Sequence, residues 1–409
     1  MNFIDISERG KLILILGFAL MLRVVFLTSY VEPDNVNIWE YGELAQNVVN
    51  GKCYSLFYFQ NDKLEYKFNE LSTPFPSAYM PPGYVMIILP FFYLTEKTTS
   101  ILYIIFFQIL LSLFVIYFLY LITKQIFGGI TALFAALIYA LLPEFIYSTA
   151  SITPTLVFHF LILVIVYRLK KQDENSKIDY FLPILFSILI YFRSEFLFYL
   201  IILFTFFLFK KKFIQVFKFS LVILLLILPW TIRNMIVFDS FVPFTTNVGI
   251  NLYRGNNVSD VGGWGEKIME ERITQISRNN QFEVLMNKEY LDHAIKYIID
   301  RPLVFLGNSF RKIFELWGFS LNDIRATNPF YLIPWLTLLS FFVVGILYGY
   351  NWQQQKYIHF VFGYFTLISA IFFALPRYQS MMKVLVLPFA AEGIIICFHR
   401  LKEWIGKAK

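Results

Sequence analysis

The feature that most constrains this chain is a series of long apolar runs separated by short polar loops. Runs of roughly 18 or more apolar residues are long enough to cross the hydrocarbon core of a bilayer as α-helices. Charged residues make up only 15% of the 409 residues and hydrophobic residues 58%, whereas a soluble chain of this length carries far more charge on its surface. The sequence therefore predicts an all-α protein that crosses the membrane many times.

The apolar runs predict about ten transmembrane helices, within a range of about 8 to 12. Their expected positions are 11–30, 99–123, 129–147, 152–167, 178–192, 195–209, 214–231, 331–350, 357–375 and 382–398. The run at 83–95 is too short for a full crossing, so we expect it to dip into the membrane or to lie along its surface. No small-residue cleavage site follows residues 11–30, and we expect them to be retained as the first span.

Clusters of Lys and Arg set the expected orientation. With the N-terminus in the cytoplasm, the basic segments RLKKQDENSK (168–177), KKK (210–212) and HRLKEWIGKAK (399–409) all fall on the cytoplasmic side, as the positive-inside rule requires. These segments account for the net charge of +7, so we expect a plasma (inner) membrane protein with no nucleic-acid partner. We expect one membrane-embedded domain over 1–409, with non-cytoplasmic loops at 31–82 and 232–329 that carry juxtamembrane helices, and C-terminal spans in 330–409.

Polar chemistry has few places in such a chain. The sequence contains no nucleotide-binding, metalloprotease or serine-hydrolase motif, and its four histidines are too scattered to predict a metal site. The polar residues that recur where predicted spans end on the non-cytoplasmic side are Asp34, Glu40, Glu43, Arg193, Glu195, Arg233, Asn234, Arg254, Arg377 and Tyr378. Arginine offers planar, bidentate donors for phosphate oxygens, so this pattern predicts a site for the phosphate of a lipid.

Four stretches of the chain, taken in order, resemble one family. They are WEYGELAQNVVNG (39–51), SAYMPPGY (77–84), LPWTIRNMIVFDSFVPFTTNVGINLYRGNN (228–257) and LPRYQSMMKVLVLPFAAEG (375–393). They resemble, respectively, the first-loop helix, the element that closes the first loop, the central-span segment and the Arg-Tyr element of the GT-C integral-membrane glycosyltransferases. The nearest branch is that of the protein O-mannosyltransferases and aminoarabinose transferases, and the resemblance extends over about residues 11–398.

The resemblance implies a GT-C helical bundle and an inverting transfer of a sugar from a polyprenyl-phosphate donor to an acceptor hydroxyl on the non-cytoplasmic side. The acceptor it implies is a glycan, a lipid or a protein. It places a catalytic carboxylate in the first loop and cations on the phosphate, with no cofactor expected and metal dependence left open. The residues that it implies for substrate binding are Arg377, Tyr378, Arg233, Asn234, Arg254, Tyr84, Arg193 and Glu195.

The sequence departs from the family pattern at the catalytic carboxylate. The family's Asp usually stands about four positions before the Tyr of the loop helix, where this chain has Asn37. Asp34 lies one helical turn earlier and is our expected base, with Glu40 as the rival. Each has a structural alternative: Asp34 as the N-cap of the loop helix, and Glu40 as part of a solvated helix face.

Two further functions stay open from the sequence. One is a transporter of lipid-linked saccharides, against which we note that the chain shows no paired halves with matching broken helices. The other is a catalytically inactive relative that acts as an assembly subunit, a hypothesis that the Asn at position 37 supports. Arg193 with Glu195 is also open to interpretation as a local turn pair, and Arg377 with Tyr378 as an anchor at the membrane interface.

Overall fold

The computed structural model of the chain describes residues 7–175, 177–257, 267–320, 324–374 and 376–407, without the side chains of 175, 267–268, 324–325 and 376–377. Helices dominate it, with α for α-helices and η for 3₁₀ helices. Their bounds are α1 Glu8–Tyr30, η1 Pro33–Asn35, α2 Trp39–Val49, α3 Pro82–Leu94, α4 Lys97–Phe127, α5 Gly129–Leu141, α6 Pro143–Tyr147, η2 Ser148–Ala150, α7 Thr155–Asn175, α8 Phe181–Phe192, η3 Ser194–Phe196, α9 Leu197–Phe209, α10 Phe213–Phe238, α11 Val248–Gly255, α12 Lys267–Thr274, α13 Phe282–Asp300, α14 Pro302–Trp317, α15 Ile324–Thr327, α16 Pro329–Tyr348, α17 Trp352–Ile371 and α18 Pro376–Lys407.

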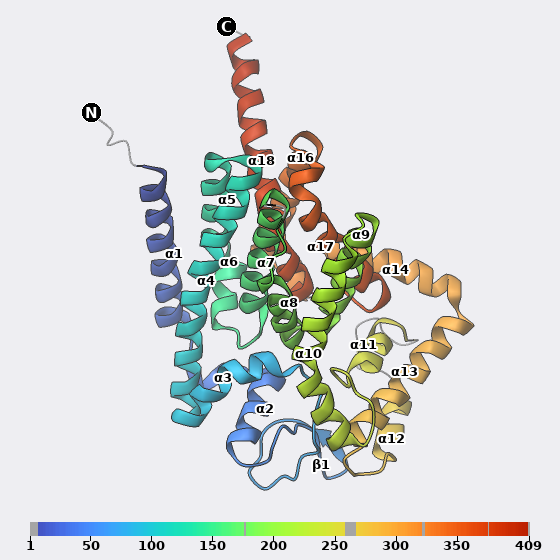
Figure 1. The fold of residues 1–409 in the computed structure, drawn as a ribbon. Helices are drawn as coiled ribbons and strands as arrows, with labels where there is room; N and C mark the ends of the chain where they lie inside the picture. Colours follow the sequence, from blue (N-terminus) through green and yellow to red (C-terminus); the bar gives the residue numbers. More distant parts are fainter. Residues whose placement is uncertain (1–6, 176, 258–266, 321–323, 375, 408–409) are drawn as a thin grey trace.

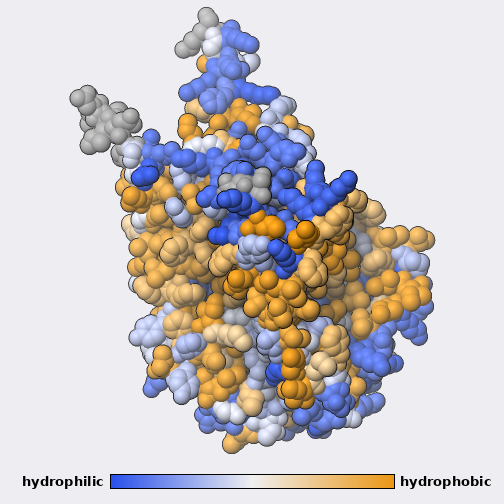
Figure 2. Space-filling view, viewed as in Figure 1, coloured by the Kyte–Doolittle hydropathy of each residue, from blue (hydrophilic) through white to orange (hydrophobic). Residues whose placement is uncertain are grey.

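The long helices run side by side in one bundle (Figure 1). Both chain termini lie at one end of it, which we call the terminal end, and α2, β1 and α12 lie at the opposite end, which we call the loop end. Hydrophobic residues cover the middle of the molecule, and hydrophilic residues gather at its two ends (Figure 2). This distribution is that of a protein whose helices are surrounded by lipid.

Every predicted span corresponds to a helix or to a pair of helices. Five helices of the described chain, α1, α4, α10, α16 and α18, are long and apolar enough to cross a membrane, and the bent pair of α5 with the segment 143–150 makes six if it is one span. The helices α3, α8 and η3–α9 are apolar but shorter. The chain is therefore a multi-pass, all-α membrane protein, and the count of about ten crossings stays a prediction.

The predicted span at 129–147 is not one straight helix. It breaks at Leu142–Pro143, where the two parts meet at 61°. Proline at 143 cannot donate to the helical ladder, so the last carbonyls of α5 need other partners. Arg23 of α1 supplies one: its Nη1 atom lies 3.4 Å from the carbonyl oxygen of Ala140. The charged residue inside the first span thus caps the end of another helix.

The polar tract of the first loop contains a small hairpin that the sequence did not predict. Strand β1 (Tyr58–Gln60) pairs antiparallel with β2 (Lys63–Glu65), and Asn61 and Asp62 form the turn with positive φ angles of 50° and 58°. The amphipathic helix expected after the first span is α2, and the short apolar run is α3, which lies across the ends of the long helices (Figure 1). The first loop is therefore an ordered layer on the bundle.

A buried carboxylate joins the two loop segments. Glu283 of α13 accepts hydrogen bonds from the Ser77 hydroxyl and the Ala78 N–H, each at 2.7 Å, and from the Thr246 hydroxyl at 2.5 Å. Burial raises the pKa of Glu283 to about 7, although these hydrogen bonds and the nearby Arg233 oppose the increase. Three chain segments that are distant in sequence therefore meet at one titratable group.

Helices α16 and α18 pack closely against each other, and two glycines permit it. A Cβ atom at Gly345 would lie 1.9 Å from the carbonyl oxygen of Phe389, and one at Gly393 would lie 1.9 Å from that of Phe341. Both neighbours are backbone atoms, so no side chain can move away to make space. Small residues at such a crossing let two helices approach closely inside a membrane.

We predict that Gly393→Ala separates α16 from α18 and destabilises the protein by about 1–3 kcal/mol, the usual cost of overpacking. The measurement is the thermal unfolding midpoint in detergent. The matched control is Gly17→Ala in α1, because a Cβ atom there has no neighbour within 4 Å. Equal midpoints for the two variants would show that the glycine contact does not hold the crossing.

We predict that the stability of the folded protein falls as the pH rises from about 5 to 8. The pKa of Glu283 is higher in the folded state, about 7, than the ordinary value of 4.5, so the folded state binds more protons in this interval and raising the pH removes that advantage. The Glu283→Gln variant should lose most of this dependence, on the order of 1–3 kcal/mol. Its amide oxygen can accept from Ala78 and Thr246 while its NH₂ donates to Ser77. Unfolding midpoints measured across this range should thus decline more steeply in the wild type than in the variant, and equal slopes would contradict the prediction.

Candidate functional site

A continuous row of arginine and aromatic side chains lies at the loop end of the bundle. The guanidinium of Arg254, in α11, lies over the ring of Phe373 at 5.0 Å, and that ring packs against Tyr378 with centroids 5.6 Å apart. The guanidinium of Arg193, at the end of α8, lies over the ring of the same Tyr378 at 4.9 Å. We call these four residues the arginine–aromatic row. It joins α8, α11, the α17–α18 connection and α18, which the sequence separates by up to about two hundred residues.

Arg193 is held by an ion pair and by tyrosines. Its guanidinium pairs with the Glu195 carboxylate, and the two side chains are 12% and 28% exposed. Tyr41 of α2 interacts electrostatically with Arg193 and packs edge-on against Tyr84 at a centroid distance of 5.3 Å. The row is thereby extended to the first loop. A guanidinium between tyrosine rings and a carboxylate keeps its charge and orientation in a site from which most water is excluded.

Tyr84, which packs against Tyr41, is fully buried. Its hydroxyl donates to Oε1 of Gln108 in α4 at 2.9 Å, and the Gln108 amide donates to the carbonyl oxygens of Thr149 and Ser151. The element SAYMPPGY therefore ends with a tyrosine fixed inside the bundle. Gly83 allows the close approach, because a Cβ atom there would lie 2.6 Å from the carbonyl oxygen of Tyr191.

The structure thus brings together five of the ten residues predicted for the site: Tyr84, Arg193, Glu195, Arg254 and Tyr378. Arg377 lies in the first turn of α18, beside Tyr378, and its side chain lies outside the described residues. Tyr378 lies in the first turn of α18, whereas the sequence predicted that it stands between two spans. The row therefore owes part of its geometry to the start of α18.

Arg233 and Asn234 occupy a different position and bind backbone. The guanidinium of Arg233 donates to the carbonyl oxygens of Ser77 at 2.7 Å and Tyr54 at 3.1 Å. The Asn234 amide donates to the carbonyl oxygens of Val242 and Phe244 at 3.0 and 3.2 Å. Both residues fasten the loops to α10. Their described hydrogen bonds hold the loops, and the expectation that they contact a substrate stays a prediction.

Asp34 lies in η1, beside the start of α4. It is exposed, and its Oδ1 atom accepts a hydrogen bond from the Thr98 hydroxyl at 2.5 Å. Thr98 is the second residue of α4, so the carboxylate lies near the positive end of that helix dipole. Asp34 is not the cap of α2. That helix begins at Trp39, whose N–H donates to the side-chain oxygen of Asn37 at 2.8 Å.

Glu40 lies on a different face of α2 from Tyr41. It interacts electrostatically with Tyr66 and with Glu43, which is buried and accepts the Phe68 N–H at 2.6 Å. Burial raises the pKa of Glu43. The pair Glu40 and Glu43 therefore faces the remainder of the first loop, whereas Tyr41 faces the arginine–aromatic row.

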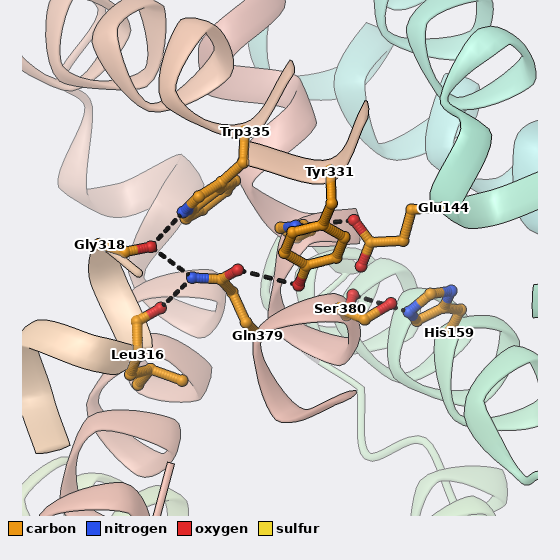
Figure 3. A network of polar contacts seen from close by, with 9 residues as sticks. Glu144, His159, Leu316, Gly318, Tyr331, Trp335, Gln379 and Ser380 are labelled. Atoms are coloured by element: carbon orange, nitrogen blue, oxygen red, sulfur yellow. Dashed lines mark hydrogen bonds and ion pairs between the residues drawn. The ribbon is translucent and has the colours of Figure 1, made fainter. Parts of the chain in front are cut away.

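A polar network beneath the row was missed by the sequence interpretation. Lys383 of α18 and Glu144 of α6 form an ion pair at 2.7 Å, with side chains only 2% and 14% exposed. The Lys383 ammonium also lies over the rings of Tyr331 at 3.7 Å and Trp335 at 4.7 Å. Figure 3 shows this network around the start of α18. The available signal was a charged residue inside each of two apolar runs, Glu144 in 129–147 and Lys383 in 382–398, because charges inside membrane segments usually pair with each other.

A second contact of the network comes from α7. Its His159 is fully buried between the Tyr139 hydroxyl, 3.2 Å from Nδ1, and the Ser380 carbonyl oxygen, 3.1 Å from Nε2. Among the described residues, no three His, Cys, Asp or Glu side chains are grouped so that they could hold a metal ion. His159 therefore acts as a link between helices in this structure.

The family model of the dolichyl-phosphate-mannose-protein mannosyltransferases matches residues 80–233. A sequence search of the curated proteins finds no match. The apo oligosaccharyltransferase of Archaeoglobus fulgidus aligns over 100% of this chain and 52% of its own, with 12% identity and a TM-score of 0.57.

Two further solved structures align over most of the chain. The oligosaccharyltransferase AglB of Archaeoglobus fulgidus, in complex with an inhibitory peptide and a dolichol-phosphate, covers 98% of this chain and 52% of its own, with 12% identity and a TM-score of 0.55. ArnT from Cupriavidus metallidurans, bound to undecaprenyl phosphate, covers 95% and 77%, with 12% identity and a TM-score of 0.43. The chain spans about half the length of the archaeal oligosaccharyltransferases that it matches.

The oligosaccharyltransferase alignments confirm the GT-C fold that the sequence predicted, because they extend over nearly the whole chain at TM-scores above 0.5. The family match includes Tyr84, Arg193 and Glu195. The chain has a GT-C helical-bundle fold, and its resemblance to the mannosyltransferase branch of these membrane glycosyltransferases is confirmed.

Proposed function

We propose that this protein is a membrane glycosyltransferase that takes a sugar from a polyprenyl-phosphate donor and transfers it, with inversion, to an acceptor hydroxyl on the non-cytoplasmic side. The observation that carries the proposal is the arginine–aromatic row, which lies where the two loop segments meet the bundle. The AglB structure was determined with a dolichol-phosphate, a lipid of the same chemical class as the donor we propose. The family match to dolichyl-phosphate-mannose-protein mannosyltransferases supports the same donor class.

The row suits a phosphate that is leaving a sugar. Negative charge grows on the phosphate as the glycosidic bond breaks, and fixed cations in a site of low dielectric constant stabilise it. Arg254 is oriented by the ring of Phe373, and we assign it to the phosphate together with Arg377 of the adjoining helix turn. Arg193 is neutralised by Glu195, so we assign this pair to the hydroxyls of the sugar.

We assign Asp34 as the general base. As the acceptor oxygen bonds to the anomeric carbon and the carbon–phosphate oxygen bond breaks, the hydroxyl proton passes to the Asp34 carboxylate, and the phosphate departs with the bonding electrons. The hydrogen bond from Thr98 fixes one carboxylate oxygen, and exposure makes the residue accessible to an acceptor. Glu40 faces Tyr66 and remains the rival assignment. The acceptor is a hydroxyl of a glycan, lipid or protein.

We place the termini in the cytoplasm of a plasma membrane. The basic residues of the described chain support this orientation. Lys124 lies in the last turn of α4, the 210–212 cluster lies between α9 and α10, and further basic residues lie in the last turns of α18. All of them are at the terminal end of the bundle (Figure 1). The loop end, with the arginine–aromatic row, then faces the periplasm or the exterior.

The transfer is tested in proteoliposomes with a panel of radiolabelled polyprenyl-phosphate hexoses and pentoses. We expect consumption of one donor with release of the polyprenyl phosphate. Asp34→Asn should lower kcat by about 10²- to 10⁴-fold, because it removes a general base, and should leave binding of the polyprenyl phosphate intact. A protein that moves the labelled lipid across the bilayer without consuming it would be a transporter, which contradicts the proposal.

The control for Asp34→Asn is Asp62→Asn. Asp62 lies in the same loop and forms an exposed ion pair with Arg278, so its loss should change little. Glu40→Gln is measured beside them. If that variant loses turnover and Asp34→Asn keeps it, the base is Glu40 and our assignment of Asp34 is wrong.

The orientation is tested with the protein's own cysteines. Cys53 is exposed in the first loop, whereas Cys397 lies half-buried in α18 towards the terminal end. In a Cys397→Ser background, a membrane-impermeant maleimide added to intact cells should label Cys53. Labelling only after the cells are opened would place the loop end in the cytoplasm and reverse the proposed topology.

A further inference from the structure

Helix α14 is joined by hydrogen bonds to the chain segment that carries Phe373 and Tyr378, the two rings of the row. One set of bonds is donated by a side chain of α14, and the other set by a side chain of that segment. On one side, Lys312 of α14 reaches across to this segment, by which we mean the described residues 371–374 and 376–380. Its Nζ atom donates to the carbonyl oxygens of Ile371 at 3.3 Å and Phe372 at 3.0 Å, and to Oδ1 of Asn256 at 3.1 Å. Lys312 is fully buried. All three of these partners are neutral oxygens, so the ammonium acts as a clamp on backbone carbonyls.

On the other side, Gln379 of α18 reaches back to α14. Its Nε2 atom donates to the carbonyl oxygens of Leu316 and Gly318, each at 2.8 Å, and its Oε1 atom accepts the Tyr331 hydroxyl at 3.0 Å (Figure 3). Gln379 is only 3% exposed. The carbonyls at the end of α14 that lack helical partners are satisfied by this amide.

The two contacts enclose the aromatic rings of the row. Phe373 follows the carbonyls that Lys312 binds, and Tyr378 directly precedes Gln379. Helix α11, which carries Arg254, packs on the same segment: a Cβ atom at Gly255 would lie 1.4 Å from the Phe372 carbonyl oxygen, and the Asn256 amide donates to the Ile371 carbonyl at 2.9 Å. A shift of this segment would therefore move both rings away from their arginines.

We propose that Lys312 and Gln379 are positioning residues of the donor site: from opposite ends, they fix the segment that places Phe373 under Arg254 and Tyr378 under Arg193. The inference rests on the proposed function, because it takes the row as the place where the donor phosphate binds. Neither residue touches the donor. Each acts through the backbone that it holds, and α14 becomes the brace of the site.

The charge of Lys312 makes the brace sensitive to pH. Burial lowers the pKa of Lys312 to about 8, and the neighbouring Arg311 lowers it further while Glu315 opposes both. On the elements packed against Lys312, its described contacts are the Asn256 amide oxygen and two backbone carbonyls. As the pH rises through about 8, the ammonium loses a proton and its hydrogen bonds lose their charge assistance. Arginine at this position would keep its charge over the whole range.

The experiment measures binding of a polyprenyl phosphate to the full chain in nanodiscs between pH 6.5 and 9. Lys312→Met and Gln379→Leu should each weaken binding at pH 7 by about tenfold, because the first removes the described donor to the Phe372 carbonyl and the second removes that to the Leu316 carbonyl. Lys312→Arg should bind nearly as the wild type does at pH 7. Wild-type binding should weaken as the pH rises through 8 by a larger factor than that of Lys312→Arg. Lys296→Met, an exposed lysine of α13, is the matched control and should change neither the affinity nor the pH profile.

The outcomes separate this inference from the proposed function. Arg254→Gln is measured in parallel as a variant of the row itself. If the wild type does not bind the lipid, or if Arg254→Gln binds it equally well, the proposed donor site is wrong and the positioning role falls with it. If Arg254→Gln loses binding while Lys312→Met and Gln379→Leu do not, only the positioning role is wrong. Should Lys312→Met fail to fold, the comparison of pH profiles between the wild type and Lys312→Arg decides, and identical profiles overturn the inference.

Discussion

Polar groups inside a lipid-surrounded bundle must find their partners within the protein, and this constraint shapes the structure. The break between α5 and α6 leaves carbonyls that lipid cannot solvate, and a fully buried arginine from α1 reaches one of them. The start of α6 places Glu144 where Lys383 of α18 can neutralise it. On both sides of this break, a residue is thus contacted by a charged side chain of another helix. The helices cannot move independently, because moving one would leave a buried charge unpaired.

The same constraint explains why the candidate site lies at the loop end, near the start of α18. Irregular backbone is tolerated at membrane depth only where protein covers it. At the end of α17, helices α11 and α14 pack on the described chain, where Lys312 and Asn256 bind the carbonyls of Ile371 and Phe372. A segment fixed in this way can hold aromatic rings in one orientation, and two arginines can stack on them without a large entropic cost on binding. The requirement to satisfy backbone groups therefore also produces a rigid place for an anionic ligand.

Elements that depend on local pattern were predictable, and contacts between distant segments were not. The apolar runs predicted the positions of the long helices, and the resemblance of 39–51 to a first-loop helix predicted α2, because both signals lie within a few turns of chain. Five of the ten predicted site residues converge, since membrane-exit positions on one face are brought to one end by topology alone. Nothing local distinguishes Arg233, which binds the first loop, from Arg254, which joins the row. Their roles are decided by Ser77 and Phe373, which lie more than a hundred residues away.

The balance of charge in the row suggests how specificity and affinity are divided. Taking a guanidinium out of water is costly, and Arg193 offsets that cost with the Glu195 carboxylate, which leaves a nearly neutral pair that can recognise hydroxyls by geometry. A phosphate adds negative charge and requires an excess of positive charge close by. In the proposed site we assign the phosphate to the α11 and α18 side, where Arg254 lies over the Phe373 ring, and not to the Arg193 pair. The sugar and the phosphate of one donor would then meet different parts of one row, with the Tyr378 ring between them. The two parts are carried by helices that only the finished bundle brings together, so the donor site depends on how α18 packs against α8 and α11.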